Sequence, residues 1–520
     1  MSVLSLIIAT PLLAAIGLLL VPRSMNYLCP IITRGAAGFS FLLSLGMFLV
    51  YPQMASGPGG FKFYEKVPWV ESLGIHYQVG VDGINVGLLL MGAAVALAAS
   101  FATWGIDRRV REFHFLFLVM TGGILGAFAS LDVFFFYFFH ELALVPTFIM
   151  IGVWGRGENR TYATFKITIY LTIGALIALI GLVSLYVQSG AQTFDMIELT
   201  AHVRDNPIPA GQQSIIFPLL LFGFGILVSL WPFHTWAPIG YGAAPAAAAM
   251  MHSGVLKKFG LYGLIRLAVP MVPEGIRAWL EVFCLLALGN ILYCGWVAMR
   301  QKDLNFLIGN SSVAHMGLAF LGIASLSLIG ITGAVTIMVA HGLLAALSFM
   351  LSGYLYHAKG TTEIEKLGGL LQKIPFIGVC LVIAMLAGCG VPGFANFAGE
   401  LLVLFGAWDS FPWYVVAGAW GALIIGAVYC LRAIRNILHG PSADADGDIM
   451  DAQGLTARFP FVLLVVLLIL FGIYPRLLTD RVSSSAEALV TQANQATALV
   501  LPESNIQLGQ TDAAQTQTDF

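Results

Sequence analysis

The sequence predicts an all-α polytopic membrane protein with about 14 transmembrane helices, two of them broken within the membrane. Hydrophobic residues make up 58% of the 520 residues and charged residues 10%, with a mean hydropathy of +0.87. Soluble domains carry about 25% charged residues. Apolar stretches of about 20 residues, each able to cross a ~30 Å hydrocarbon core, recur along the whole chain. The composition therefore excludes a soluble domain.

The apolar stretches predict the spans in chain order. We expect them at 2–21, 31–51, 83–103, 112–131, 133–154, 164–188, 214–235, 244–270, 279–299, 303–325, 327–356, 372–395, 400–435 and 458–477. The 400–435 stretch is too long for one span, so part of it is assigned to an interruption beside Pro392-Gly393. The first stretch lacks a charged start and a cleavage site of small residues, which indicates a retained helix.

Between the spans, little of the chain remains. Residues 52–82 are expected to form a short external hairpin, and 189–213 a short amphipathic turn. The predicted units are an N-terminal three-helix region with an external loop (1–111), a first repeat (112–278), a second repeat (279–436), a C-terminal helix (437–481) and a polar, partly disordered tail (482–520).

The distribution of Lys and Arg predicts the orientation. With the N-terminus outside, sixteen of these residues fall on the inward side and seven on the outward side. Two more, Lys257 and Lys258, lie inside a span. We therefore expect an integral membrane protein, in a bacterial inner membrane, with its N-terminus outside.

Two spans carry proline and glycine in their interiors. Pro232 and His234 lie in the first, and Pro392 and Gly393 in the second. Proline removes a backbone donor and clashes one turn back, so each helix is expected to break. Paired breaks in the two halves of a chain are typical of transporters built from inverted repeats. Two inverted five-helix repeats are the favoured arrangement, and a parallel repeat or channel-like bundle is the alternative.

Glu141 lies in the apolar run from Phe134 to Met150. A carboxylate in hydrocarbon is costly unless it faces the bundle interior, meets a partner or carries a proton. The functional interpretation is proton transfer, and the alternative is a carboxylate that only joins neighbouring helices.

Other ionisable side chains fall inside or at the ends of spans, namely Lys166, His252, Lys257, Lys258, His315, His341 and Glu400. Lys166 begins its span and could extend to the inner surface. Adjacent helix positions point about 100° apart, so only one of Lys257 and Lys258 is expected to face a pathway. A histidine in a span is more often a hydrogen-bonded core residue. Together, however, these groups suit a proton relay.

The sequence argues against several other kinds of site. Its six cysteines are scattered singly, without metal-ligand spacing, so no iron–sulfur, haem or zinc site is expected. The net charge of −2 and the lack of a basic patch argue against nucleic acid as a partner.

Several motifs carry a resemblance to a known family. They are Gly80-Val-Asp-Gly83, Glu141-Leu-Ala-Leu-Val-Pro146, Pro232-Phe-His-Thr-Trp236, Gln301-Lys-Asp-Leu304, Ser311-Ser-Val-Ala-His-Met-Gly317, His341-Gly342, Gly368-Gly369 and Pro392-Gly393 leading to Gly399-Glu400. Over roughly residues 75–480, the chain resembles the proton-pumping antiporter-type subunits of respiratory complex I. The form of the Glu141 motif favours the subunit M (chain 4) branch over the L and N branches.

The resemblance implies fourteen helices, inverted repeats and a central polar axis. It also assigns roles: Glu141 would be the acid of the first half-channel, Lys258 the central lysine, His315 and His341 the connecting histidines, and Glu400 the exit-side acid. The family's first-half lysine, five residues before Pro232, falls on Leu227. Either Lys166, His140 or Lys257 replaces it, or this half-channel pumps differently or not at all.

The resemblance therefore implies a membrane-arm subunit of an NADH:quinone oxidoreductase that translocates protons as partner subunits reduce quinone. NADH, FMN, iron–sulfur clusters and quinone would bind to those partners, which include L-type and N-type antiporter-like subunits, and the chain itself would hold no cofactor or metal. The alternatives are a subunit of a multi-subunit cation/proton antiporter or membrane-bound hydrogenase, and a non-conducting scaffold.

Overall fold

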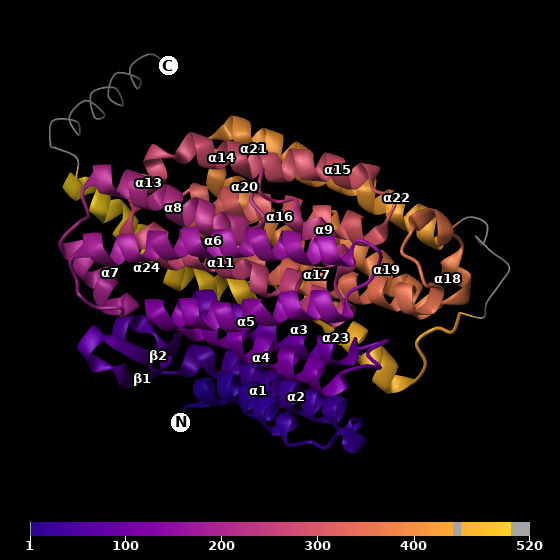
Figure 1. The fold of residues 1–520 in the computed structure, drawn as a ribbon. Helices are drawn as coiled ribbons and strands as arrows, with labels where there is room; N and C mark the ends of the chain where they lie inside the picture. The colour runs from indigo at the N-terminus through magenta and orange to yellow at the C-terminus, as the bar shows by residue number, and fades with distance from the viewer. Residues whose placement is uncertain (1, 440–448, 501–520) are drawn as a thin grey trace, which may run out of the picture.

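The computed structural model describes residues 2–439 and 449–500, most of which are helical (Figure 1). Within these ranges, eleven helices are long and apolar enough to cross a membrane, and three shorter helices are also apolar. The structure thus confirms the all-α membrane class. Because these helices are identified by length and composition alone, the number of fourteen spans stays a prediction.

The N-terminal region contains three long helices and a hairpin. They are α1 (Val3–Leu19), α2 (Leu28–Val50), β1 (Lys62–Val70), β2 (Ile75–Val81) and α3 (Gly83–Phe101). The two strands pair antiparallel, which confirms the predicted hairpin, and its external position stays a prediction. The Lys66 Nζ atom lies 2.7 Å from Asp195 and 3.1 Å from Glu198, joining the hairpin to α7. Burial alone would lower the pKa of Lys66, but these hydrogen bonds outweigh it and raise the pKa.

The first half of the bundle contains the first broken helix. Its elements are α4 (Val110–Ala129), α5 (Val133–Trp154), α6 (Arg160–Ser189), α7 (Met196–Asp205), α8 (Ala210–Val228), α9 (Trp236–Ala243), α10 (Ala246–Gly254), the 3₁₀ turn η5 (Leu256–Lys258), α11 (Phe259–Gly263), the π-helical segment η6 (Leu264–Ala268), α12 (Val269–Met271) and α13 (Pro273–Ala278). The gap between α8 and α9 contains Pro232, as expected. The amphipathic α7 lies in the loop where a short turn was predicted.

The second half repeats this pattern of long helices and one interruption. Its elements are α14 (Leu280–Leu288), the π-helical segment η7 (Gly289–Cys294), α15 (Gly295–Arg300), α16 (Leu304–Ala324), α17 (Leu328–Lys359), α18 (Leu370–Lys373), α19 (Pro375–Gly388), α20 (Ala395–Trp408), α21 (Pro412–Ala419), the π-helical segment η9 (Trp420–Ile425) and α22 (Gly426–Leu438).

One predicted span boundary in this half was wrong, and the 400–435 stretch, expected to be too long for one span, is divided. The span expected at 372–395 ends at Gly388, where the second break begins, and the stretch 400–435 is divided between α20 and the continuous run of α21, η9 and α22. Apolar residues continue across the second break, so hydropathy alone could not separate α19 from α20, whereas Asp409 and Ser410 mark the turn between α20 and α21.

The C-terminal part contains α23 (Gly454–Ile473) and α24 (Arg476–Val500). The polar tail predicted from residue 482 is therefore helical up to residue 500, whereas 501–520 lie outside the described residues. Leu478, Val482, Ala486 and Ala493 recur at helical spacing and are buried. This apolar stripe packs α24 against α3 and α17, and it was overlooked because the composition is polar.

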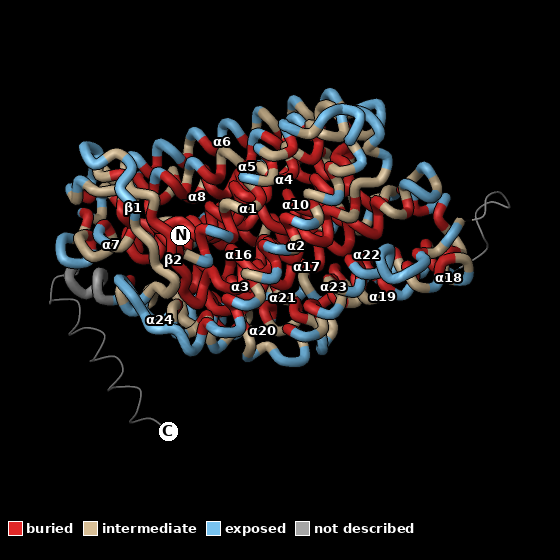
Figure 2. The backbone as a smooth tube through the Cα atoms, turned by 90° about the horizontal axis from the view of Figure 1, so that it is seen from below, coloured by how far each residue is buried: buried red, intermediate tan, exposed pale blue. Residues whose placement is uncertain are grey.

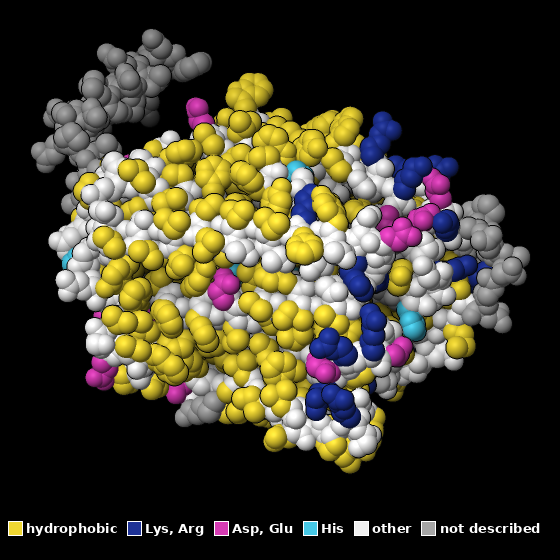
Figure 3. Space-filling model, viewed as in Figure 1, with side chains coloured by type: hydrophobic (Ala, Val, Ile, Leu, Met, Phe, Trp, Pro, Cys, Tyr) yellow, Lys and Arg dark blue, Asp and Glu magenta, His cyan; other side chains and the backbone are white. Residues whose placement is uncertain are grey.

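The helices α3 and α17 occupy the middle of the bundle. Almost every residue of α3 and most of α17 are buried, and Figure 2 shows buried backbone filling the centre with exposed backbone at the rim. The two views place the hairpin, α7, α13 and α24 at one end and α18 at the other (Figure 1). Lys and Arg side chains gather toward the end with α18 and α19 (Figure 3). This asymmetry has the pattern expected for an inward-facing end.

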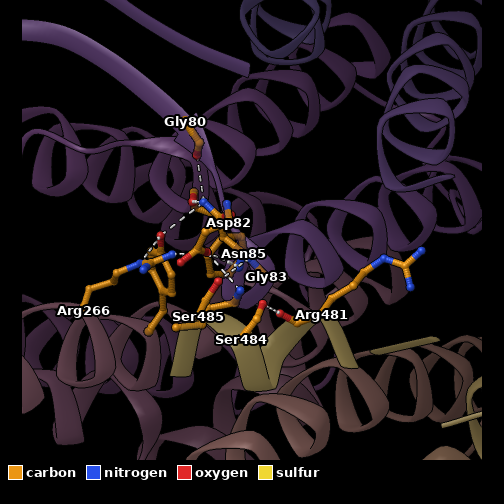
Figure 4. Close-up of polar contacts among 11 residues, drawn as sticks. Gly80, Asp82, Gly83, Asn85, Arg266, Arg481, Ser484 and Ser485 are labelled. Atoms are coloured by element: carbon orange, nitrogen blue, oxygen red, sulfur yellow. Dashed lines mark hydrogen bonds and ion pairs between the residues drawn. The ribbon is translucent and has the colours of Figure 1, made fainter. Parts of the chain in front are cut away.

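Asp82 anchors the start of α3 at the end of the bundle with the hairpin (Figure 4). Its carboxylate accepts hydrogen bonds from the backbone N–H groups of Ile84 and Asn85, and the Asn85 side chain accepts one from the Asp82 N–H. The same carboxylate pairs with the buried guanidinium of Arg266. One side chain thus caps α3 and neutralises a cation from the first half.

The backbone of α24 passes close to this cap. The Gly83 N–H donates to the Ser485 hydroxyl, 2.9 Å away. A Cβ at Gly83 would lie 1.7 Å from the carbonyl oxygen of Arg481, so only glycine permits the contact. The Gly80-Val-Asp-Gly83 motif therefore joins the hairpin, α3 and the C-terminal helix.

We expect Asp82→Ala to lower the thermal unfolding midpoint of the detergent-solubilised complex clearly. The substitution leaves the buried Arg266 guanidinium without its counter-ion, which costs about 3–5 kcal/mol. The control is Asp480→Ala, at an exposed carboxylate near the same end. Equal midpoints for the two variants would contradict this role of Asp82.

Candidate functional site

The two buried lysines lie where helix geometry is interrupted between α10 and α11. Val255 leaves the α-helical conformation, and the 3₁₀ turn η5 carries Lys257 and Lys258. The Lys258 Nζ atom donates to the carbonyl oxygen of Ser253 at 2.6 Å and lies 2.8 Å from Nδ1 of His341. The Lys257 Nζ atom donates to the Ser312 hydroxyl at 3.1 Å. Both lysines therefore reach polar partners on neighbouring helices, and the expectation that only one of them faces a pathway stays a prediction.

A charged Lys258 fixes the tautomer of its partner. An ammonium group can only donate, so Nδ1 of His341 must accept, and the proton of the neutral imidazole then lies on Nε2. The structure records no carboxylate within ion-pairing distance of either lysine among the described residues. A charge at this position is consequently stabilised by neutral partners alone, and loss of its proton to a neighbour relieves the cost of burial.

His341 connects the lysine to the second half of the bundle. The rings of His341 and His315 lie 5.5 Å apart between centroids, and Nδ1 of His315 lies 3.3 Å from Oε1 of Glu400. All three side chains are buried, and only 3% of Glu400 is exposed. Lys258, His341, His315 and Glu400, from helices α10–α11, α17, α16 and α20, thus form one continuous series.

A small cavity lies beside the two histidines. Its volume is about 20 Å³, and its polar lining consists of His315, His341, Ser311, Ser312 and Ser348. One water molecule needs roughly 10–15 Å³ and two to four polar partners. The cavity therefore meets both requirements for a single water, and it touches Ser312, the partner of Lys257.

Glu141 occupies a different environment from Glu400. Its side chain is 35% exposed at the surface of this chain, and its Oε1 atom lies 3.3 Å from Nδ1 of the buried His140. The His140 ring stacks on Phe259 at 3.9 Å, and Phe259 directly follows Lys258. Glu141 thus contacts the lysine-bearing segment only through His140.

The position of the missing lysine is filled by apolar packing. Leu227 is buried near the end of α8. Lys166 is half-buried on α6, over the rings of Tyr162 and Tyr170, and the described residues show no ion pair between it and Glu141. Of the three proposed substitutes, His140 is the one in contact with the acid.

The first helix break is held by Asn290, a residue that the sequence analysis missed. Its Oδ1 atom accepts from the Trp231 N–H at 2.5 Å, and its Nδ2 group donates to the carbonyls of Ser229 and Val313 at 3.1 and 3.0 Å. Pro232 lies within this break, and His234 is buried against Tyr293. A polar asparagine in an otherwise apolar helix was the sequence feature that could have identified Asn290.

The second break brings the chain close to Glu400. Gly390 has a φ of +67°, and a Cβ there would lie 2.5 Å from Oε2 of Glu400. Pro392 and Gly393, with a φ of +102°, complete the turn before α20. Because Gly390 has no side chain, the break leaves room for the Glu400 carboxylate, which any other residue at this position would displace.

Further polar groups near this break also escaped the sequence analysis. The amide of Asn396 is fully buried without a hydrogen-bond partner in the described residues, and the hydroxyls of Ser311 and Tyr429 lie 2.9 Å apart. His252 lies apart from the series, between the rings of Trp236 and Tyr241.

The chain is similar to a family of membrane subunits. Residues 130–425 match the family described as NADH:quinone oxidoreductase/Mrp antiporter. The chain is 36% identical to F(420)H(2) dehydrogenase subunit M of Methanosarcina mazei, covering 88% of this chain and 94% of that protein. It is 32% identical to NADH-quinone oxidoreductase subunit M of Rhodobacter capsulatus, covering 94% and 96%.

Solved structures show the same fold. A chain of respiratory complex I from Thermus thermophilus matches with a TM-score of 0.84 and 30% identity, covering 94% of this chain and 99% of that one. A chain of the Mrp complex from a Dietzia species matches with a TM-score of 0.81 at 20% identity, covering 96% and 99%, and shows the fold alone.

We expect Asn290→Ala to lower the thermal unfolding midpoint of the solubilised complex, because each backbone group left unsatisfied at the break costs about 1–3 kcal/mol. The control is Asn310→Ala, since the Asn310 amide donates only to the Phe306 carbonyl one turn earlier in its own helix. A midpoint for Asn290→Ala as high as that of the control would contradict this assignment.

Proposed function

The chain belongs to the NADH:quinone oxidoreductase/Mrp antiporter family of membrane subunits, and we propose that it translocates protons through the buried series from Lys258 to Glu400. The assembly is a complex I-like quinone oxidoreductase, in which this chain is the subunit M of the membrane arm. The observation that carries the proposed pathway is the continuity of Lys258, His341, His315 and Glu400 inside the bundle.

Each transfer in the series moves one proton. Lys258 gives a proton to Nδ1 of His341, and His341 releases its Nε2 proton toward His315. The described residues show no hydrogen bond between the two rings, and Nε2 of His315 is buried without a partner, so a water in the adjoining cavity carries the proton across. His315 then delivers a proton to Glu400, 3.3 Å away. After the transfers, each donor either is neutral or has received another proton, so no buried charge persists.

Lys257 takes the place of the absent lysine in the first half-channel. It is buried, and its hydrogen bond to Ser312 reaches the same cavity from the side of the first half. Glu141 and His140 supply protons to this segment, with His140 stacked on Phe259 two residues beyond Lys257. In this arrangement, the ammonium group lies on the interrupted helix α10–α11 and not on the broken helix α8, where the resemblance places it.

Conformational change elsewhere in the complex would drive these transfers. A change in the distance between Lys258 and its neighbours alters the cost of burying its charge, and this loads or releases the proton. L-type and N-type antiporter-like subunits are the proposed neighbours. NADH or another donor, FMN, iron–sulfur clusters and quinone would bind to partner subunits, and none to this chain. The proposed location is the bacterial inner membrane, and the distribution of Lys and Arg supports an N-terminus on the outside.

We expect Lys258→Ala and Glu400→Gln each to abolish proton translocation by this subunit, because each removes a proton-carrying group from the series. The measurement is the proton-to-electron ratio of the purified complex in proteoliposomes. The matched controls are Lys366→Ala and Glu365→Gln, whose side chains are 59% and 76% exposed. An unchanged ratio in both relay variants would refute a conducting role and favour a scaffold.

We further expect Lys257→Leu to lower the same ratio and the double variant Leu227→Lys/Lys257→Leu to restore part of it. The double variant returns an ammonium to the position where the resemblance places one. Wild-type Lys257 has no role in this half-channel if the single variant pumps normally. A loss that the double variant does not reverse would instead show that Lys257 acts only at its own position.

A further inference from the structure

A large pocket lies at the end of the bundle that carries the hairpin. Its volume is about 950 Å³, which is within the range of sites for small ligands. Its walls are the loop at residues 51–62, the helix α7 and the amphipathic helix α24. The relay described above does not use it.

The lining of this pocket is cationic. It includes Lys62, Arg204, Arg266, Arg476 and Arg481, against the carboxylates of Asp82 and Asp480, so the net charge is +3. Arg266 is neutralised by Asp82 (Figure 4), and Arg204 pairs with Asp205 outside the lining.

Two of these arginines have donors to spare. Arg481 donates from its two terminal nitrogens to the carbonyls of Leu477 and Phe48, and its buried Nε group has no partner. Arg476 is exposed, and the described residues show no hydrogen bond or ion pair to its guanidinium. Guanidinium groups with free N–H donors are suited to the oxygens of phosphate.

Apolar side chains form a second part of the lining, beside the hydroxyl and amide groups of Ser56, Thr200, Ser484, Ser485 and Gln492. Leu131, Met196, Ile197, Leu477 and Leu489 contribute to the same pocket. A small hydrophilic anion would leave these side chains facing water. An amphiphile whose anionic head meets the arginines and whose first methylenes meet the apolar side chains satisfies both parts of the lining.

The helix ends around the pocket indicate the depth at which lipid headgroups are expected. The helices α2 and α23 end at Val50 and Ile473 beside it, and α3 and α5 begin there at Gly83 and Val133. Tyr51 and Tyr474, the residues that follow those two helix ends, belong to the lining, and tyrosine is enriched at this depth. We propose that this pocket binds the phosphate headgroup of an anionic phospholipid and thereby fastens α24 to the hairpin loop and α7.

The test compares the whole complex purified with Arg476→Gln/Arg481→Gln against a control, Lys302→Gln/Lys366→Gln, in loops at the opposite end. Each complex is placed in nanodiscs of phosphatidylcholine with or without phosphatidylglycerol, and retained lipid is quantified by native mass spectrometry. We expect the pocket variant to retain phosphatidylglycerol about tenfold less well or worse, since two charge-assisted contacts are lost. The control should retain it like the wild type.

Equal retention in the pocket variant and the control would overturn the proposal. Inorganic phosphate that competes with the lipid at equal concentration would show a site for free phosphate instead. A variant complex that loses a neighbouring subunit while retaining its lipid would show a protein contact instead. If the double variant fails to assemble, the single variant Arg476→Gln, at an exposed side chain, is measured in the same way and must also retain less phosphatidylglycerol.

Discussion

A polar group inside hydrocarbon has to be satisfied by the protein itself, because lipid tails offer neither donors nor acceptors. The bundle depends on this constraint wherever a helix is interrupted. At the first break, the Asn290 side chain replaces the helical hydrogen bonds that are lost around Trp231. At the second break, the absence of a side chain at Gly390 leaves space for the Glu400 carboxylate. At each interruption, side chains or backbone of the surrounding helices thus accommodate the polar groups that the break exposes.

The same constraint explains why the proposed relay lies where it does. Lys257 and Lys258 lie in a 3₁₀ turn rather than a regular helix, and the turn directs both ammonium groups toward polar side chains. The fully buried α17 brings His341 to this point from the centre of the bundle. Packing of long apolar helices therefore positions the chemistry, and the polar series in turn joins helices from both halves.

The two halves differ in how they treat their acids. Glu400 is buried against His315, whereas Glu141 is one-third exposed on this chain and contacts His140 and Tyr137 of its own helix. The resemblance gave both acids a pathway role, Glu141 in the first half-channel and Glu400 at the exit side. Helix rotation about its own axis decides whether a side chain points inward, and that rotation depends on neighbours far along the chain. The two predicted sites are accordingly unequal in the structure.

The sequence by itself determined the membrane class, the hairpin, both helix breaks and the set of ionisable residues, because hydropathy and the proline restriction are local properties. It misplaced the helices around residues 388–412 and read α24 as a partly disordered tail, because apolar runs and polar composition do not record packing partners. Only the tertiary structure decided that Lys258 meets His341 and that His315 meets Glu400. These pairs are separated by 83 and 85 positions in the sequence, and their contacts arise only when helices from different parts of the chain pack together.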